Sequence, residues 1–88
     1  MNIQELWEAA LGEIKLSISK ANYLTWLKDS FIVDFKGSTI FLGVPSSFTK
    51  EWLENKYHKQ ILHALYSLDP KIKKVEYLVT TNGDSIKK

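Results

Sequence analysis

The stretch at residues 44–57, VPSSFTKEWLENKY, constrains the fold of this chain more than any other, because two kinds of pattern meet there. Before it, β-branched and aromatic residues run up to Pro45, which has no backbone N–H and cannot extend a strand ladder. After it, Ser46 and Ser47 are suitable helix caps, and apolar side chains recur at helical spacing to about Leu68. The stretch therefore predicts a strand that passes directly into a long core helix.

Two shorter helices are predicted before this junction. Asn2 and Glu5 occupy the two positions of a capping box, and apolar residues then recur at spacings of three and four to about Leu16. Ser19 is a suitable cap for a second helix over residues 20–28. We therefore expect the chain to begin with two helices separated by a short connection.

The second of these helices has more apolar residues than one buried stripe needs. They spread widely around the helical wheel, so one edge of the helix is expected to stay uncovered. That edge carries Trp26 with the small polar neighbours Asn22 and Thr25. An exposed aromatic side chain among polar ones is typical of a surface that binds a partner.

A hairpin is predicted after the second helix, because the apolar period changes to two. Phe31, Val33 and Phe35 are expected to face one way, and Ile32 the other way together with Asp34. A turn with Gly37 at positive φ then leads into a returning strand at residues 39–44. A third strand is expected at residues 75–79, beyond the long helix.

The element order is thus helix, helix, strand, strand, helix, strand, which predicts an α+β domain with a three-stranded sheet packed against helices. This order resembles that of KH-type folds, but the Gly-x-x-Gly loop with which KH domains hold a nucleic-acid backbone is missing. With 88 residues, the chain is expected to form one domain over residues 1–80, followed by a polar tail at residues 81–88.

Catalytic chemistry finds little support in the sequence. His58 and His63 are five positions apart and point to different sides of a helix, so we expect them to be solvated rather than to share a metal. The chain has no cysteine, and its four glycines are isolated and form no phosphate-binding loop. We therefore expect no enzyme activity, no cofactor and no metal site.

The charge and hydropathy of the chain also limit its partners. The net charge is +2, and arginine, the residue that reads guanine edges best, is absent. This composition argues against sequence-specific DNA reading. No apolar run approaches the ~20 residues of a membrane span, so no membrane partner is expected either.

Aromatic residues remain as the candidates for function. Trp7 lies within the apolar stripe of the first helix, so a place in the core and a surface role both stay open for it. The same two alternatives stay open for Phe48, which lies in the first turn of the long helix. Trp52 is expected in the core.

Three motifs in order resemble those of a known family. They are Leu6-Trp7, Thr25-Trp26-Leu27, and Val44 to Phe48 leading into residues 51–57. With these motifs, about residues 3–80 resemble the N-terminal domain, domain I, of the bacterial chromosomal replication initiator DnaA. The resemblance implies a cytoplasmic, nucleoid-associated interaction domain for DNA replication initiation. Its implied partners are the replicative helicase, regulators of initiation and a second copy of the domain.

The resemblance also assigns residues to these partners. It implies self-association through Trp7. It implies helicase and regulator binding through the second helix and the start of the long helix, at Asn22, Tyr23, Thr25, Trp26, Ser47 and Phe48. Asn22 is neutral where some members of the family are acidic, so a charge-assisted helicase contact is not implied. The polar tail would be the start of a linker toward an ATPase domain and a DNA-binding domain.

A KH-like module that binds single-stranded nucleic acid is the alternative function. Some members of the family bind single strands weakly, and the lysines available for this are Lys50, Lys56, Lys71, Lys73 and Lys74. Bases would then stack on Phe41 or Tyr77. Solvated surface remains the competing interpretation of these lysines.

Overall fold

The computed structural model describes residues 2–80, so the prediction of a polar tail lies outside the described residues. The elements in chain order are α1 (Ile3–Ile14), α2 (Lys20–Asn22), the π-helical turn η1 (Tyr23–Leu27), β1 (Phe31–Lys36), β2 (Thr39–Val44), α3 (Ser47–Trp52), a second π-helical turn η2 (Leu53–Tyr57), α4 (His58–Leu68) and β3 (Lys74–Val79).

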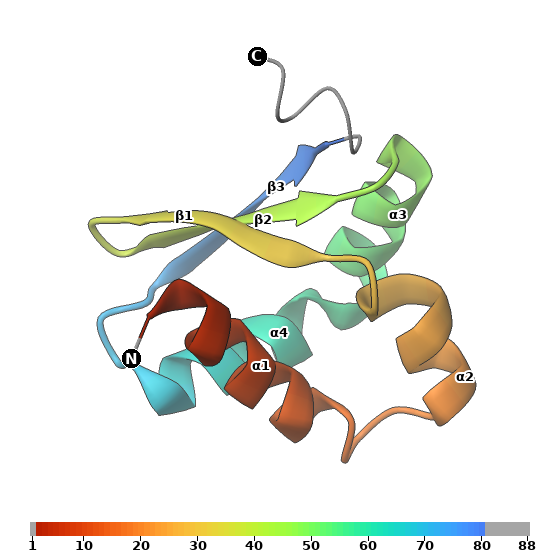
Figure 1. Ribbon diagram of the computed structural model, residues 1–88, viewed down its shortest axis with the longest axis horizontal. Coiled ribbons are helices and arrows are strands. Elements are labelled where there is room, and N and C mark those ends of the chain that lie inside the picture. The colour runs from red at the N-terminus through yellow and green to blue at the C-terminus, as the bar shows by residue number, and fades with distance from the viewer. Residues whose placement is uncertain (1, 81–88) are drawn as a thin grey trace.

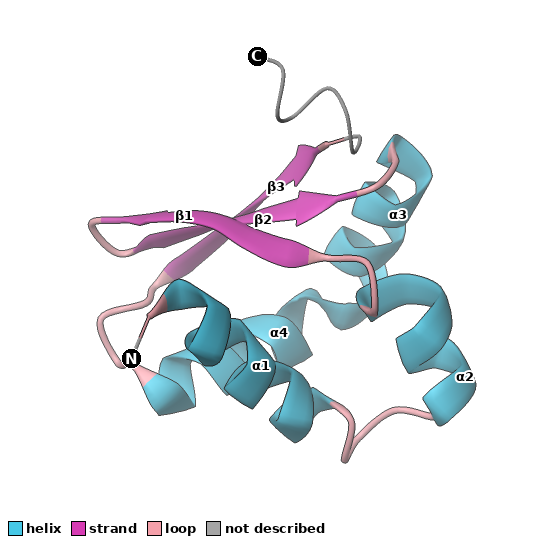
Figure 2. Cartoon of the chain, in the orientation of Figure 1, coloured by secondary structure: helices cyan, strands magenta, loops and turns pink. Residues whose placement is uncertain are grey.

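The three strands form one mixed sheet in the order β1-β2-β3 (Figure 2). β1 and β2 pair antiparallel through a turn in which Gly37 has a φ of 60°, as predicted, and β3 runs parallel to β2. The parallel pairing needs a long crossover connection, which α3, η2 and α4 supply. Figure 1 shows α1 and α4 side by side beneath the sheet. The predicted α+β class, with a three-stranded sheet packed against helices, is confirmed.

The first helix begins as predicted and ends earlier. Asn2 and Glu5 form a complete capping box, in which the Asn2 side chain accepts from the Glu5 backbone N–H and the Glu5 side chain accepts from that of Asn2. The helix ends at Ile14, not at Leu16, because the backbone N–H and the hydroxyl of Ser17 both donate to the Ile14 carbonyl oxygen. Leu16 is consequently 87% exposed.

The long helix predicted to reach Leu68 is interrupted. At Tyr57 the backbone leaves the helical region, with φ −119° and ψ 2°, and α4 starts in a new direction. Because of this break α3 packs against the ends of β2 and β3, while α4 packs against α1. A single straight helix would not serve both contacts. The second predicted helix is altered in a similar way, since it widens into η1, where the Lys28 N–H donates to the Tyr23 carbonyl oxygen at 3.0 Å.

The predicted alternation along β1 is wrong beyond Val33. The register shifts between Ile32 and Asp34, so one extra residue is accommodated and the alternation inverts. Phe35 therefore pairs with Ile40 and packs against the core, on the same face as Ile32. Phe31 and Val33 stay on the opposite face, where both are exposed.

Candidate interaction surface

Three aromatic side chains from two separate elements lie together at one end of the molecule. The indole rings of Trp26, in η1, and Trp52, in α3, are stacked with centroids 4.6 Å apart and planes 16° apart. The Phe48 ring, near the start of α3, lies tilted against Trp26 with centroids 5.4 Å apart. We call Trp26, Phe48 and Trp52 the aromatic cluster.

Exposure increases across the aromatic cluster. Trp52 and Trp26 are half-buried and pack against the core, whereas Phe48 is 65% exposed. Ser46 holds Phe48 in place, because its hydroxyl accepts the Thr49 N–H at 3.1 Å and so fixes the first turn of α3. The structure thus presents Phe48 to solvent on a support of two stacked indoles.

Trp52 was expected in the core, and it is instead the inner member of the aromatic cluster. Its indole Nε1 is buried and has no hydrogen-bond partner among the described residues. Its ring has Trp26 as a stacking partner, and the Lys56 ammonium lies 5.7 Å from its centroid. Ring contacts rather than a hydrogen bond therefore hold this side chain, at the cost of one unsatisfied donor.

The other residues assigned to helicase and regulator binding are placed as follows. Asn22, Thr25 and Ser47 are exposed. Tyr23 is half-buried beneath the Lys15 ammonium, which lies 4.6 Å from its ring centroid, and it lines a hollow between the α1–α2 connection and α2. The structure therefore brings Trp26 and Phe48 into contact, while Tyr23 belongs to a neighbouring hollow.

Trp7 is buried, with an exposed fraction of 4%. Its indole Nε1 donates to the Ser30 carbonyl oxygen at 2.9 Å, and the side chain lies at the base of a hollow of about 420 Å³ that Ile3 and Phe31 also line. Of the two alternatives left open for Trp7, a place in the core and a surface role, the structure shows the place in the core. The role of Trp7 in self-association stays a prediction. Because its indole is buried, Trp7 could contribute to a contact between copies only by shaping the hollow that lies over it.

The five lysines proposed for single-strand contact do not form one basic track. They lie on α3, on η2, in the α4–β3 connection and on β3. Lys74 pairs with Glu76 at 2.8 Å, and this contact raises the pKa of Lys74 and lowers the pKa of Glu76. Lys56 and Lys73 lie over the rings of Trp52 and Tyr66. Binding of single strands through these lysines stays a prediction.

Phe41 and Tyr77, on which bases would stack in the KH-like alternative, differ in how accessible their rings are. Phe41 is half-buried, but Tyr77 is only 5% exposed and presents no free ring face. Burial, helped by the negative charge of Glu54, raises the pKa of Tyr77, so its hydroxyl keeps its proton to a higher pH than an exposed tyrosine does. It lies 2.9 Å from Nδ1 of His58. His58 is therefore half-buried and hydrogen-bonded rather than fully solvated, whereas His63 is exposed as expected. No local pattern could have shown the contact of His58, because its partner is 19 positions away.

Within residues 2–80, no three histidine or acidic side chains are grouped so that they could hold a metal ion. None of the helices that these residues form is long and apolar enough to cross a membrane.

The fold and the aromatic cluster together define a class, the small α+β domain that exposes aromatic side chains on a rigid support, as protein-interaction modules do. The family model of the DnaA N-terminal domain matches residues 4–67, and the chain therefore belongs to this family. The match runs from α1 into α4, so it includes every member of the aromatic cluster and ends before β3. The chain thus carries a domain of a DNA replication initiator, of a type that is not catalytic.

Proposed function

We propose that this domain recruits the replicative helicase and receives regulators of initiation through the aromatic cluster, and that it also associates with a second copy of itself. The family supplies the setting, which is DNA replication initiation. The observation that carries the proposal is the exposure of Phe48, at 65%, on the stacked pair Trp26 and Trp52. We also propose that the domain acts in the cytoplasm, at the nucleoid, and that it needs no cofactor.

The physical argument rests on preorganisation. Large exposed aromatic side chains are frequent binding hot spots, and their value rises when little rotamer freedom is lost on binding. The Phe48 ring already leans on Trp26, so part of this ordering cost is met before a partner arrives. The exposed polar residues Asn22, Thr25 and Ser47 are suited to form the hydrated rim that surrounds such a hot spot.

The test compares two phenylalanines of similar chemistry at different sites. Phe48→Ala is expected to weaken binding of the helicase N-terminal region by at least thirtyfold, since truncating a hot spot costs about 2 kcal/mol or more. Phe31→Ala is the matched control, because Phe31 is 45% exposed on the open face of the sheet. Titration calorimetry measures both affinities. Equal affinities for the two variants would exclude the aromatic cluster as the helicase site.

Trp26 is less suitable as the first variant. It packs against the core and stacks on Trp52, so Trp26→Ala is expected to cost about 2 kcal/mol of stability as well as binding. Its binding data are therefore interpreted only after circular dichroism has shown a folded domain. Phe48→Ala removes a mostly exposed ring, and we expect a stability cost of about 1 kcal/mol or less.

Self-association is tested separately, through the surface above Trp7. Ile3 is 37% exposed at the rim of the hollow that Trp7 closes from below. If this hollow is the contact between copies, Ile3→Ser should reduce dimer formation in sedimentation velocity runs at high protein concentration, and helicase affinity should not change. Unchanged sedimentation would remove this hollow from the proposal.

A further inference from the structure

A third hollow lies on α4 and the connection to β3, and none of its lining residues belongs to the aromatic cluster. It has a volume of about 320 Å³. The residues that line it are Lys59, Leu62, His63, Tyr66, Ile72 and Lys73. The four lining positions on α4 are 59, 62, 63 and 66, and since 59 and 62, 59 and 63, and 62 and 66 are three or four apart, they lie on one face of this helix.

The floor of the hollow is apolar. Ile72 is completely buried beneath it, Leu62 is half-buried and packs against the core, and Tyr66 is 47% exposed at its side. An open apolar hollow of this size has room for one apolar side chain of another molecule. Filling it would remove apolar surface from water, which is the main driving force of association.

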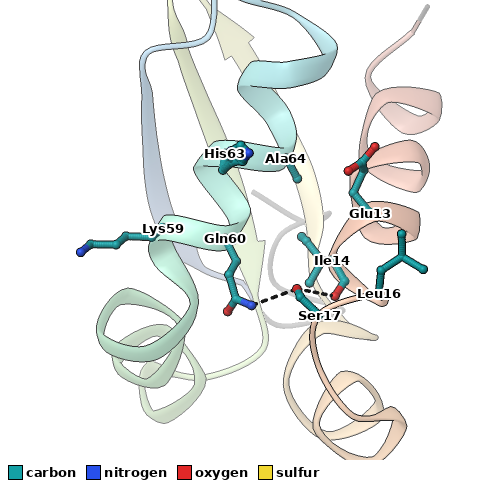
Figure 3. Close-up of a pocket in the computed structure, with 8 residues that line it drawn as sticks. All are labelled: Glu13, Ile14, Leu16, Ser17, Lys59, Gln60, His63 and Ala64. Carbon is teal, nitrogen blue, oxygen red and sulfur yellow. Dashed lines mark hydrogen bonds between the residues drawn. The ribbon is translucent and has the colours of Figure 1, made fainter.

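The rim of the hollow is basic. Lys59 and Lys73 contribute two ammonium groups, and none of the described residues that line the hollow carries a carboxylate. Figure 3 shows the neighbouring groove between α1 and α4, where Glu13 lies on the α1 side and Lys59 extends away from α1. The Lys59 charge is thus directed away from that acidic side chain. The rim therefore favours a ligand with negative charge close to its apolar group.

We propose that this hollow binds an acidic segment of a partner protein, which inserts one aliphatic side chain between Leu62, Tyr66 and Ile72 and places carboxylates near Lys59 and Lys73. The surface is separate from the aromatic cluster, so the inference does not depend on the proposed function. The hollow recognises its partner by charge and by one apolar side chain that the partner inserts. The aromatic cluster, in contrast, presents its own protruding Phe48 ring to a partner.

Single-stranded nucleic acid also carries negative charge, but the geometry of the hollow disfavours it. The Lys73 ammonium lies 5.2 Å from the centroid of the Tyr66 ring, so one face of this ring is already occupied and is not free for a base to stack on. A base inserted into the hollow would also bring its polar edges against the apolar floor of Leu62 and Ile72. An aliphatic side chain has neither difficulty.

The experiment is an amide chemical-shift titration of the labelled domain with short synthetic peptides. The probe has one leucine flanked on each side by two glutamates, and the control peptide has serine in place of the leucine. We expect the leucine peptide to shift the signals of Lys59, Tyr66 and Lys73, and the serine peptide to bind several-fold more weakly. Equal affinity of the two peptides would overturn the proposal, because the hollow would then take no apolar anchor.

Charge reversal tests the rim. In the double variant Lys59→Glu and Lys73→Glu, affinity for the leucine peptide should fall about tenfold, since each exposed ion pair contributes a factor of roughly 2 to 5. The matched control reverses Lys20 and Lys28, which are also exposed and line no part of this hollow. An equal loss in the control would mean that net charge alone attracts the peptide, and the proposal would fail.

A short oligothymidylate, titrated in the same way, distinguishes the two classes of macromolecule. We expect it to leave the signals of Leu62 and Tyr66 unchanged at concentrations at which the leucine peptide shifts them. If the oligonucleotide shifts these signals and the peptide does not, the hollow is a nucleic-acid site and the assignment to an acidic protein segment is wrong.

Discussion

The indole Nε1 of Trp7 donates a hydrogen bond of 2.9 Å to the carbonyl oxygen of Ser30, and both residues are buried. This contact joins α1 to the residue that precedes β1. Ser30 is fixed from its other side as well, since its hydroxyl and its backbone N–H both donate to the Leu27 carbonyl oxygen. Trp7 thus anchors the connection at the end of η1, the turn that carries Trp26.

The first prediction follows from this anchor. Trp7→Phe should lower the free energy of unfolding by about 2–3 kcal/mol, because it removes a buried hydrogen bond and leaves a cavity. Trp52→Phe is the matched variant, since its Nε1 has no partner in the described structure, and it should cost about 1 kcal/mol less. Urea denaturation measures both. Equal costs would show that the bond to Ser30 contributes nothing net.

Much of the fold could be predicted because the relevant signals are local. The Asn2–Glu5 capping box, the turn at Gly37 and the cap before α3 each involve residues within a few positions of one another. The break at Tyr57 could not be predicted in this way. It depends on α3 and α4 packing against different parts of the molecule, which the apolar spacing of one helix does not show.

The candidate site, too, could be predicted from local patterns only in part. The wide spread of apolar residues around the second helix predicted an uncovered edge at Trp26, Asn22 and Thr25. Asn22 and Thr25 are exposed, but Trp26 is half-buried, and the apolar residue left exposed, at 46%, is Leu24. The contact of Trp26 with Trp52 joins residues 26 positions apart, and no pattern within either segment shows it. The bulge in β1 is a further example, because alternation continues past Val33 in the sequence while the backbone inverts it.

A second prediction concerns alkaline pH. Burial raises the pKa of Tyr77 above its ordinary value of 10.0, so the folded protein keeps this proton at a pH where the unfolded chain releases it. The unfolded state then binds fewer protons, and stability must fall as the pH rises above about 10. Below that pH, this contribution to stability is fully present.

Tyr77→Phe provides the measurement for this effect. At pH 8 the variant should be less stable by about 0.5–1.5 kcal/mol, since the hydrogen bond to His58 is lost. Between pH 9 and pH 11 its free energy of unfolding should decline less steeply than that of the unsubstituted domain. Parallel declines for the two proteins would show that Tyr77 ionises alike in the folded and unfolded chains.

A third prediction concerns the close contact over Gly43 in β2. A Cβ atom at this position would lie 2.9 Å from Cγ2 of Val33 and 3.0 Å from the Phe31 ring. Gly43→Ala should therefore destabilise the domain by about 1–3 kcal/mol through overpacking. Adding Val33→Ala should restore part of this loss, because it removes the nearest atom. A double-mutant cycle by urea denaturation measures the coupling, and purely additive effects would contradict the contact.

The last prediction uses alanine at two other glycines whose backbones differ. Gly12 lies on the exposed side of α1 and nothing approaches the place of its missing Cβ, so Gly12→Ala should stabilise the domain by about 0.5–1 kcal/mol. Gly37 has equally open surroundings but a φ of 60°, and Gly37→Ala should cost about 1–2 kcal/mol. Thermal unfolding should therefore shift the two Tm values in opposite directions. Because neither new methyl group meets a neighbour, that difference in sign measures backbone conformation alone, and a lowered Tm for Gly12→Ala would mean that α1 does not continue through this position.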